Sequence, residues 1–175
     1  MEHDFSRIKA FAFDVDGVMT DGGILCDLEG ELYRTFDSKD GFAIRMAAMN
    51  GYLLSIITGG RSASIRARAH SLLIPDADVY LSSRRKAEDF EDFCKRHSLD
   101  PSEVMFFGDD VPDIEVFRRC GIGVCPSDGA PDAIAAAHIV SDFPGGRGCV
   151  RDMLEKVMKQ QGRWIFDSML YSRMY

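Results

Sequence analysis

The feature that most constrains this chain is the apolar run Ala10-Phe11-Ala12-Phe13, followed directly by Asp14-Val15-Asp16-Gly17. An apolar run of this length is typical of a strand buried in a sheet that is covered on both faces. Parallel α/β sheets place their chemistry at the carboxyl ends of such strands. The sequence therefore predicts that Asp14 and Asp16 lie at the edge of a parallel sheet, where a ligand can reach them.

Asp14 and Asp16 are close enough to need a partner of opposite charge. Side chains alternate between the faces of an extended segment, so residues 14 and 16 point the same way. Two like charges at that spacing repel each other unless a cation or a shared proton offsets them. Mg²⁺ suits the pair because it takes one or two protein carboxylates, keeps several waters and accepts substrate phosphate. The motif alone also fits a turn cap before Gly17, so it leaves both interpretations open.

The composition is that of a globular protein and argues against several classes of partner. Of the 175 residues, 46% are hydrophobic and 28% are charged, which predicts one domain with a sizeable core. A formal net charge of −7 argues against broad attraction to nucleic acid or to an anionic membrane. The start Met1-Glu2-His3-Asp4 is unlike a signal peptide, and no apolar stretch has membrane-spanning length, so we expect a cytoplasmic protein.

The cysteines and histidines follow no pattern of a binding site. The five cysteines are scattered without a Cys-x-x-Cys pair, which predicts neither a disulfide framework nor a zinc site. The four histidines lack the i, i+4 spacing of a metal-binding helix. We expect reduced, mostly buried cysteines and histidines without a ligand role.

Strand and helix patterns alternate along the chain after a short ribbon. Strand-like segments at 23–25 and 32–36 flank the polar turn 27–30, which predicts a hairpin. The expected helices cover 40–50, 61–73, 86–97, 113–120, 130–137 and, after a glycine-rich turn at 145–148, a final segment to about residue 161. The expected strands between them cover 52–57, 78–81, 104–107, 122–125 and 139–140. The alternation predicts an α/β fold, with a three-layer, Rossmann-like and mostly parallel sheet.

Three of the predicted strands end in polar clusters. Asp14 and Asp16 follow the first strand, Thr58-Gly59-Gly60 follows 52–57, and Gly108-Asp109-Asp110 follows 104–107. The carboxyl ends of parallel strands lie on one side of a sheet, so clusters remote in sequence can meet there. We expect these three clusters to form one site.

Together with Lys86, the three clusters resemble in order and spacing the four motifs of the haloacid dehalogenase superfamily of phosphatases. A closer resemblance, covering most of the chain, is to the capless 3-deoxy-D-manno-octulosonate 8-phosphate phosphatase family. The segments that carry it are Asp-Val-Asp-Gly-Val-Met-Thr-Asp-Gly at 14–22, Lys-Asp-Gly at 39–41, Ile-Thr-Gly-Gly-Arg at 57–61, Gly-Asp-Asp-Val-Pro-Asp at 108–113 and Gly-Gly-Arg-Gly-Cys-Val-Arg at 145–151. The resemblance implies a single phosphatase domain over residues 1–175.

This resemblance implies a role for each acidic residue of the clusters. Asp14 is expected to be the nucleophile that attacks phosphorus and forms an aspartyl-phosphate. Asp16 is expected to be the general acid and base. In the family, Mg²⁺ is held by the carboxylate of Asp14, the backbone carbonyl of Asp16 and the carboxylate of Asp109, so we expect the same ligands here.

The same resemblance assigns the phosphate contacts. Thr58 and the backbone amide of Gly59 are expected to hold phosphoryl oxygens, and Lys86 is expected to supply fixed positive charge. Family members often carry a glycine a few residues before this lysine, whereas Ser82-Ser83-Arg84-Arg85 stands here. The two arginines of that segment compete with the lysine for the role, although they also fit a solvated helix start.

Further charged residues near the motifs are candidates for supporting roles. Asp110 and Asp113 are expected to orient metal-bound waters or the lysine, and Asp113 fits equally well as an acid at a helix N-terminus. Arginine can bind a carboxylate through two parallel hydrogen bonds. The candidates for binding the substrate carboxylate are Arg61, Lys39, Arg147 and Arg151, each of which also fits an ordinary surface cation.

The segments between the motifs are too short for a separate cap domain, so only a small β-hairpin flap, at about 18–37, stands in its place. Phosphoryl transfer benefits from the exclusion of water, which predicts that a neighbouring subunit completes the lid.

The tail at about 162–175 carries large apolar side chains, each of which gains about 1.5 to 3 kcal/mol on full burial. They are Trp164, Ile165, Phe166, Met169, Leu170, Tyr171, Met174 and Tyr175. The resemblance implies a homotetramer in which hairpins meet and tails reach a neighbour's active site. A tail folded on its own subunit is the alternative.

The implied activity is Mg²⁺-dependent hydrolysis of a small sugar-acid phosphate, 3-deoxy-D-manno-octulosonate 8-phosphate, in lipopolysaccharide biosynthesis. One alternative is a phosphatase for a nine-carbon keto acid 9-phosphate of the sialic acid type, because the same core serves both substrates. The other is an inactive oligomerisation module. Such a module would have no use for a complete set of motif residues, namely Asp14, Asp16, Thr58, Lys86 and Asp109.

Overall fold

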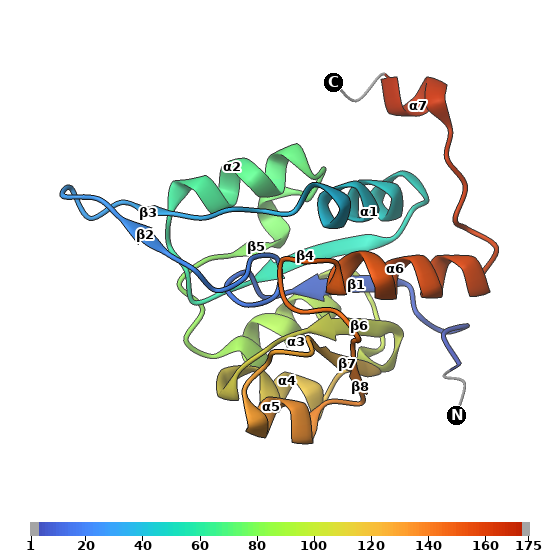
Figure 1. The fold of residues 1–175 in the computed structure, drawn as a ribbon. Helices are drawn as coiled ribbons and strands as arrows, with labels where there is room; N and C mark the ends of the chain where they lie inside the picture. The colour runs from blue at the N-terminus through green and yellow to red at the C-terminus, as the bar shows by residue number, and fades with distance from the viewer. Residues whose placement is uncertain (1–3, 173–175) are drawn as a thin grey trace.

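The computed structural model describes residues 4–172. Within this range six strands form a parallel sheet in the order β5-β4-β1-β6-β7-β8 (Figure 1). The strands are β1 (Ala10–Phe13), β4 (Leu53–Ile57), β5 (Val79–Tyr80), β6 (Val104–Phe107), β7 (Ile122–Cys125) and β8 (Ile139–Val140). The predicted α/β fold with a mostly parallel sheet is confirmed.

Helices cover both faces of the sheet. One core contains side chains of α1 (Ser38–Met49), α2 (Ala63–Ser71) and α6 (Cys149–Gln160). A second core contains side chains of α3 (Lys86–Arg96), α4 (Ile114–Phe117) and α5 (Pro131–Ala136). The molecule therefore has three layers, with the sheet in the middle.

The central strand β1 shows why the sheet is covered on both sides. Phe11 and Phe13 belong to the first core, and Ala10 and Ala12 to the second, and none of the four has measurable exposure. This follows from the alternation of side chains along a strand. Slipping β1 by one residue would exchange the phenylalanines and alanines between the two cores, so packing fixes where the following acids stand.

The predicted hairpin forms a separate two-stranded sheet with shorter strands than expected. β2 (Leu25–Cys26) pairs antiparallel with β3 (Leu32–Tyr33), and the ribbon projects from the body of the molecule (Figure 1). The Asp27 N–H donates to the Glu31 carbonyl within the turn. Neither strand pairs with the main sheet, so the ribbon forms a sheet of its own.

Several boundaries differ from the predicted ones for local reasons. α1 begins at Ser38 rather than residue 40, because the Asp37 carboxylate caps it by accepting from the Lys39 and Asp40 N–H groups. The helix expected at 113–120 is a 3₁₀ turn at Val111–Asp113 followed by the short α4. The expectation that α6 is the final helix was wrong, since α7 (Ser168–Ser172) follows it.

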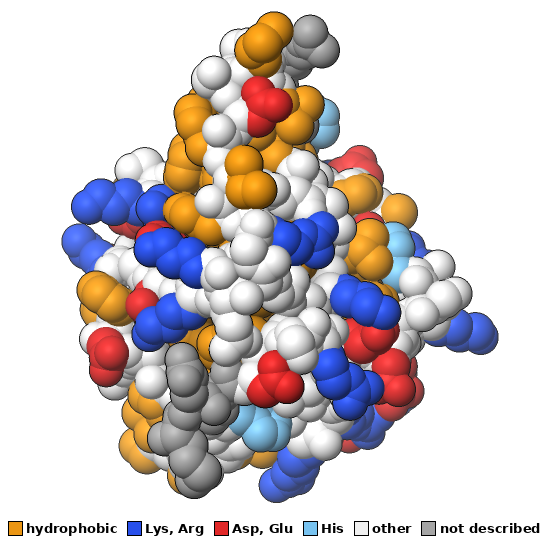
Figure 2. All heavy atoms as spheres, turned by 90° about the vertical axis from the view of Figure 1, so that its right-hand side faces the viewer, with side chains coloured by type: hydrophobic (Ala, Val, Ile, Leu, Met, Phe, Trp, Pro, Cys, Tyr) orange, Lys and Arg blue, Asp and Glu red, His pale blue; other side chains and the backbone are white. Residues whose placement is uncertain are grey.

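The C-terminal tail packs partly on α1 of the same chain. Phe42 of α1 has ring contacts with Trp164, Phe166 and Tyr171, at centroid distances of 5.9 to 6.5 Å. Ile165, Phe166, Met169 and Leu170 remain exposed, and Figure 2 shows the apolar projection that they form with α7 at the top of this view. Met174 and Tyr175 lie outside the described residues.

All five cysteines are free, and four of them are buried, which agrees with the expectation of mostly buried cysteines, whereas Cys26 is exposed. Among the helices described, none combines the length and the apolar character needed to cross a bilayer.

Candidate active site

The middle of the sheet brings the predicted clusters to one cavity. β4, β1 and β6 are adjacent, and Thr58, Asp14 and Asp109 lie at or just beyond their carboxyl ends. The cavity at this edge has a volume of about 330 Å³. Its lining residues are Asp14, Asp16, Gly17, Gly22, Thr58, Gly59, Gly60, Lys86, Asp109, Asp110 and Pro112. Segments that the sequence separates by tens of residues therefore share one pocket.

Lys86, the first residue of α3, lies between two buried carboxylates. Its Nζ donates to Oδ2 of Asp14 at 2.5 Å and to Oδ1 of Asp113 at 2.6 Å. Burial alone would lower the pKa of the Lys86 amine, but the two carboxylates outweigh it and raise this pKa above its ordinary value. The side chain is therefore a fixed cation next to Asp14.

Arg84 and Arg85, the competitors for this role, point elsewhere. Both residues are exposed, and Arg85 forms an ion pair with Glu88 on the surface of α3. The nearby Ser82 has φ 55°, in the left-handed region that glycine adopts without strain. The serine thus takes up the turn that a glycine would make in this segment, and Lys86 still reaches Asp14.

Asp113 supports the loop that carries Asp109. Its side chain is fully buried, and its Oδ2 accepts from the backbone N–H groups of Asp109 and Asp110 at 3.0 and 3.2 Å. Its other oxygen accepts from Lys86. Asp113 therefore accepts three internal hydrogen bonds, which fits the predicted supporting role better than that of a free helix-terminal acid.

Asp14, Asp109 and Asp113 form a carboxylate cluster whose nearest oxygens all lie within 4.8 Å of one another. Burial, and then the charges of Asp14 and Asp113, raise the pKa of Asp109 to about 7. Gly17 leaves room for this carboxylate, since a Cβ there would lie 2.0 Å from Oδ2 of Asp109. An all-oxygen, negatively charged cluster of this kind fits a hard divalent cation.

The loop that carries Thr58 is hydrogen-bonded to the segment that precedes α3. Ser82 donates its backbone N–H to the Gly60 carbonyl, and Ser83 donates its own to the Thr58 carbonyl. The Thr58 hydroxyl accepts from the Gly60 N–H at 3.2 Å. Thr58 and Gly59 therefore present a hydroxyl and backbone to the cavity that also holds Asp14 and Lys86.

Sequence reasoning missed Arg34, which binds Asp16. Arg34 follows β3 of the hairpin, and its Nε and Nη2 donate to Oδ1 and Oδ2 of Asp16 at 2.5 and 2.9 Å. The hydrogen bonds to Asp16 raise the pKa of the Arg34 guanidinium above its ordinary value. The one available signal was the alternation Leu32-Tyr33-Arg34, which turns Leu32 and Arg34 to the same side of the ribbon.

The structure does not bring the predicted substrate-binding cations to this cavity. Lys39, Arg147 and Arg151 line a separate cavity of about 430 Å³ beside α6. Arg147 forms an ion pair with Asp21 at 3.1 Å, and Arg151 packs over the Trp164 ring. Arg61 is exposed and is not among the lining residues of the carboxylate cavity. Within one chain these four cations therefore lie away from the carboxylate cavity, and their contact with substrate stays a prediction.

The fold and this arrangement of acids, lysine and threonine define a haloacid dehalogenase-like hydrolase. The family model described as haloacid dehalogenase-like hydrolase matches residues 76–149. The 3-deoxy-D-manno-octulosonate 8-phosphate phosphatase of Salmonella typhi is 32% identical over 157 residues, which cover 90% of this chain and 82% of that protein. The chain therefore belongs to the 3-deoxy-D-manno-octulosonate 8-phosphate phosphatase family, and it is an enzyme of the phosphatase class.

Solved structures show the same likeness. The crystal structure of 3-deoxy-D-manno-octulosonate 8-phosphate phosphatase from Yersinia pestis superposes with a TM-score of 0.88 and 31% identity, covering 91% of this chain and 85% of the Yersinia chain. The one from Moraxella catarrhalis, in complex with a magnesium ion, a phosphate ion and a KDO molecule, gives a TM-score of 0.87 and 30% identity. That match covers 97% of this chain and 95% of the Moraxella chain.

The raised pKa of Asp109 predicts how the ion-free protein responds to pH. The unfolded carboxyl ionises near 3.8 and the folded one near 7, so between these values the folded state holds the extra proton. The contribution of Asp109 to stability must then fall as pH rises from about 4 to about 7. Thermal unfolding in a chelator should show wild type losing stability, relative to Asp109→Asn, across this window.

Mg²⁺ provides the control for that experiment. A cation that binds the carboxylates favours their ionised form, so added Mg²⁺ should stabilise wild type more at pH 8 than at pH 5. The asparagine variant should show a smaller gain. A difference between the two proteins that stays constant with pH would contradict the assigned pKa.

Proposed function

We propose that this phosphatase hydrolyses 3-deoxy-D-manno-octulosonate 8-phosphate to the free sugar acid and phosphate, with Mg²⁺, as a step of lipopolysaccharide biosynthesis. The observation that carries the proposal is the contact of Lys86 with Asp14 in the cavity that also holds Asp16, Thr58 and Asp109. Substrate identity rests on the relatives, whose names and bound molecules point to this sugar acid.

In this proposal Asp14 is the nucleophile. Its Oδ1 accepts from the Val15 N–H at 2.6 Å and its Oδ2 accepts from Lys86, which fixes the carboxylate at the base of the cavity. An oxygen of Asp14 attacks phosphorus and forms an aspartyl-phosphate as the bond to the sugar oxygen breaks. The ammonium of Lys86 offsets the negative charge that accumulates next to Asp14.

Asp16 moves the protons in both halves of the reaction. It gives a proton to the departing sugar oxygen, and then takes one from the water that attacks the aspartyl-phosphate. The Thr58 hydroxyl and the Gly59 N–H hold the phosphoryl oxygens. The carboxylates of Asp14 and Asp109 and the carbonyl of Asp16 would hold Mg²⁺, which would supply positive charge between the anionic nucleophile and the phosphoryl group.

Residues 1–175 act in this account as one phosphatase domain whose hairpin is the flap over the site. The enzyme is proposed to work in the cytoplasm. Specificity among sugar acids is set above the phosphate cavity, because the phosphate contacts are the same for any phosphomonoester.

Phosphate release from a panel of substrates tests this function. We expect Mg²⁺-dependent release with a higher kcat/KM for the eight-carbon 8-phosphate than for a nine-carbon keto acid 9-phosphate. Asp14→Asn should abolish release, and circular dichroism with a cooperative thermal transition should show that the variant is folded. Asp142→Asn is a matched control, since Asp142 is an exposed acid outside the cavity, and it should keep full activity. Release that survives Asp14→Asn would refute the covalent mechanism, and preference for the nine-carbon substrate would refute the assignment of substrate.

The exposed apolar side chains support a shared active site in a homotetramer. Leu25, Leu28 and Tyr33 of the hairpin are 71%, 102% and 52% exposed, and the tail adds Ile165 and Met169. Apolar groups gathered on a projecting ribbon mark an interaction surface. In the proposed assembly the hairpins of four chains meet, and each tail reaches towards the site of a neighbour.

Light scattering on the purified enzyme tests the assembly. The proposal predicts a mass four times that of the 19.5 kDa chain. Changing Leu25 and Leu28 together to Asp should lower that mass and the turnover, because charged groups would have to be buried where the hairpins meet. Val140→Asp, at an exposed apolar residue of β8, should change neither. A 19.5 kDa particle with full turnover would exclude a shared site.

A further inference from the structure

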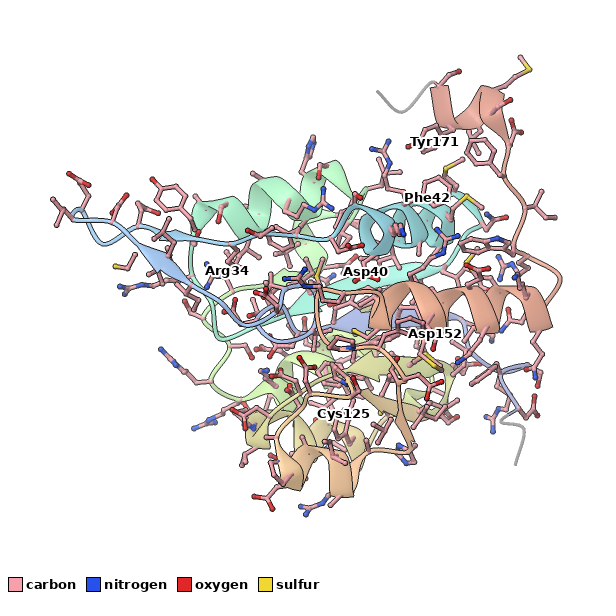
Figure 3. All side chains as sticks on the ribbon, in the orientation of Figure 1. Arg34, Asp40, Phe42, Cys125, Asp152 and Tyr171 are labelled. Carbon is pink, nitrogen blue, oxygen red and sulfur yellow. The ribbon has the colours of Figure 1, made fainter. Side chains whose placement is uncertain are left out.

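Arg34, which follows β3 of the hairpin, binds the Asp16 carboxylate through two of its nitrogens, and we call this paired contact the fork. Nε and Nη2 of Arg34 each donate to a different oxygen of the Asp16 carboxylate, at 2.5 and 2.9 Å. The third nitrogen, Nη1, donates to the Leu32 carbonyl of the same ribbon at 3.1 Å. A paired, planar contact of this kind fixes the orientation of a carboxylate as well as its place. Figure 3 labels Arg34 near the base of the hairpin.

Arg34 itself lies outside the cavity. Its side chain is 1% exposed, whereas that of Asp16 is 30% exposed. Asp16 is among the lining residues of the carboxylate cavity and Arg34 is not. A substrate in the cavity therefore meets Asp16, with Arg34 behind it.

Local sequence makes room for the guanidinium. Along the ribbon Tyr33 and Thr35 are exposed while Leu32 and Arg34 are partly covered, so the alternation turns Arg34 inward. On the other side stands Gly60, where a Cβ would lie 3.4 Å from Nη2 of Arg34 and 2.6 Å from Cδ1 of Ile65. A Cβ at Gly60 would clash with Ile65 and would just contact Nη2 of Arg34, so the guanidinium lies directly against this glycine.

We infer that Arg34 is a positioning residue, which holds the Asp16 carboxylate in the orientation needed for proton transfer at the substrate oxygen. This inference rests on the proposed function, because it assigns Asp16 the proton-transfer role. A carboxylate has about four lone-pair positions and the fork uses two, so each oxygen keeps one position for a proton or a cavity ligand. Without Arg34 the side chain of Asp16 can rotate, and misplaced catalytic groups lose rate steeply.

The inference makes the hairpin part of the catalytic machinery of its own chain. Its apolar tip supports assembly, while its base sets the orientation of an acid in the cavity. The two functions of the ribbon can be separated, because Arg34 lies several residues from Leu28 at the tip.

Steady-state kinetics of Arg34→Ala and Arg34→Lys, each in the wild-type and the Asp16→Asn background, test the inference. With the sugar-acid phosphate, Arg34→Ala should lower kcat roughly 10- to 100-fold and leave KM within about twofold. Lysine keeps a cation but cannot form the fork. Arg34→Lys should therefore preserve the melting temperature and the particle mass and recover only part of kcat. In the Asp16→Asn background, Arg34→Ala should add less than about a twofold further loss.

Because we expect low activity in the Asp16→Asn background, p-nitrophenyl phosphate is the second substrate. Its leaving group needs no proton, so Arg34→Ala should lower kcat less with this substrate than with the sugar-acid phosphate, on which the comparison of backgrounds is made. Arg66→Ala is the matched control, because Arg66 forms a surface ion pair with Asp76 away from the cavity, and it should leave kcat unchanged. If Arg34→Ala fails to fold, Arg34→Lys and Arg34→Gln provide the same comparison.

Four results would overturn the inference. They are a raised KM with unchanged kcat, full recovery of kcat by lysine, a rise in kcat on removing Arg34, and an equal fold loss in both backgrounds. The first would make Arg34 a substrate contact, and the second a simple anchor for the hairpin. Failure of the proposed function has a different signature, since activity would then survive Asp14→Asn.

Discussion

The site depends on one buried ammonium placed between carboxylates. Lys86 contacts Asp14 at 2.5 Å and Asp113 at 2.6 Å, and Asp109 completes a cluster whose nearest oxygens lie within 4.8 Å. Three acids that close would repel one another strongly without an internal cation. Removing one partner of a buried ion pair typically costs about 3 to 5 kcal/mol. Lys86 therefore contributes to holding the cluster together as well as to its proposed chemistry.

Packing and hydrogen bonds around the cluster fix the positions of these side chains. The packing of β1 between two cores sets the position of Asp14, and Asp113 ties the Asp109 loop to the lysine. Ser82, in its left-handed turn, connects the Thr58 loop to the start of α3. The parallel sheet thus brings four loops to one edge, which is where α/β folds bind ligands. The hairpin is a fifth segment at this edge, and it contacts Asp16 through Arg34.

The site residues that could be predicted from the sequence are those that follow the ends of strands. Asp14, Thr58 and Asp109 each follow an apolar run, so their convergence follows from parallel topology alone. Arg34 could not be found in this way, because the angle at which a ribbon folds back depends on tertiary packing. Charge and motif make Lys39 and Arg147 candidates for substrate contact, but neither feature says which side of a loop faces the cavity, and in one chain both residues line the cavity beside α6. Helix ends were misplaced where a cap such as Asp37 decided the boundary.

The central claim is that Asp14 takes the phosphoryl group, and its most direct test is to find that group there. The enzyme would be quenched in acid while it turns over the sugar-acid phosphate with Mg²⁺. It would then be digested, and the masses of its peptides would be measured by mass spectrometry. The account predicts one added phosphoryl group on the peptide that contains Asp14, absent when the substrate is left out. Turnover with the phosphoryl group on another residue, or on none, would contradict it.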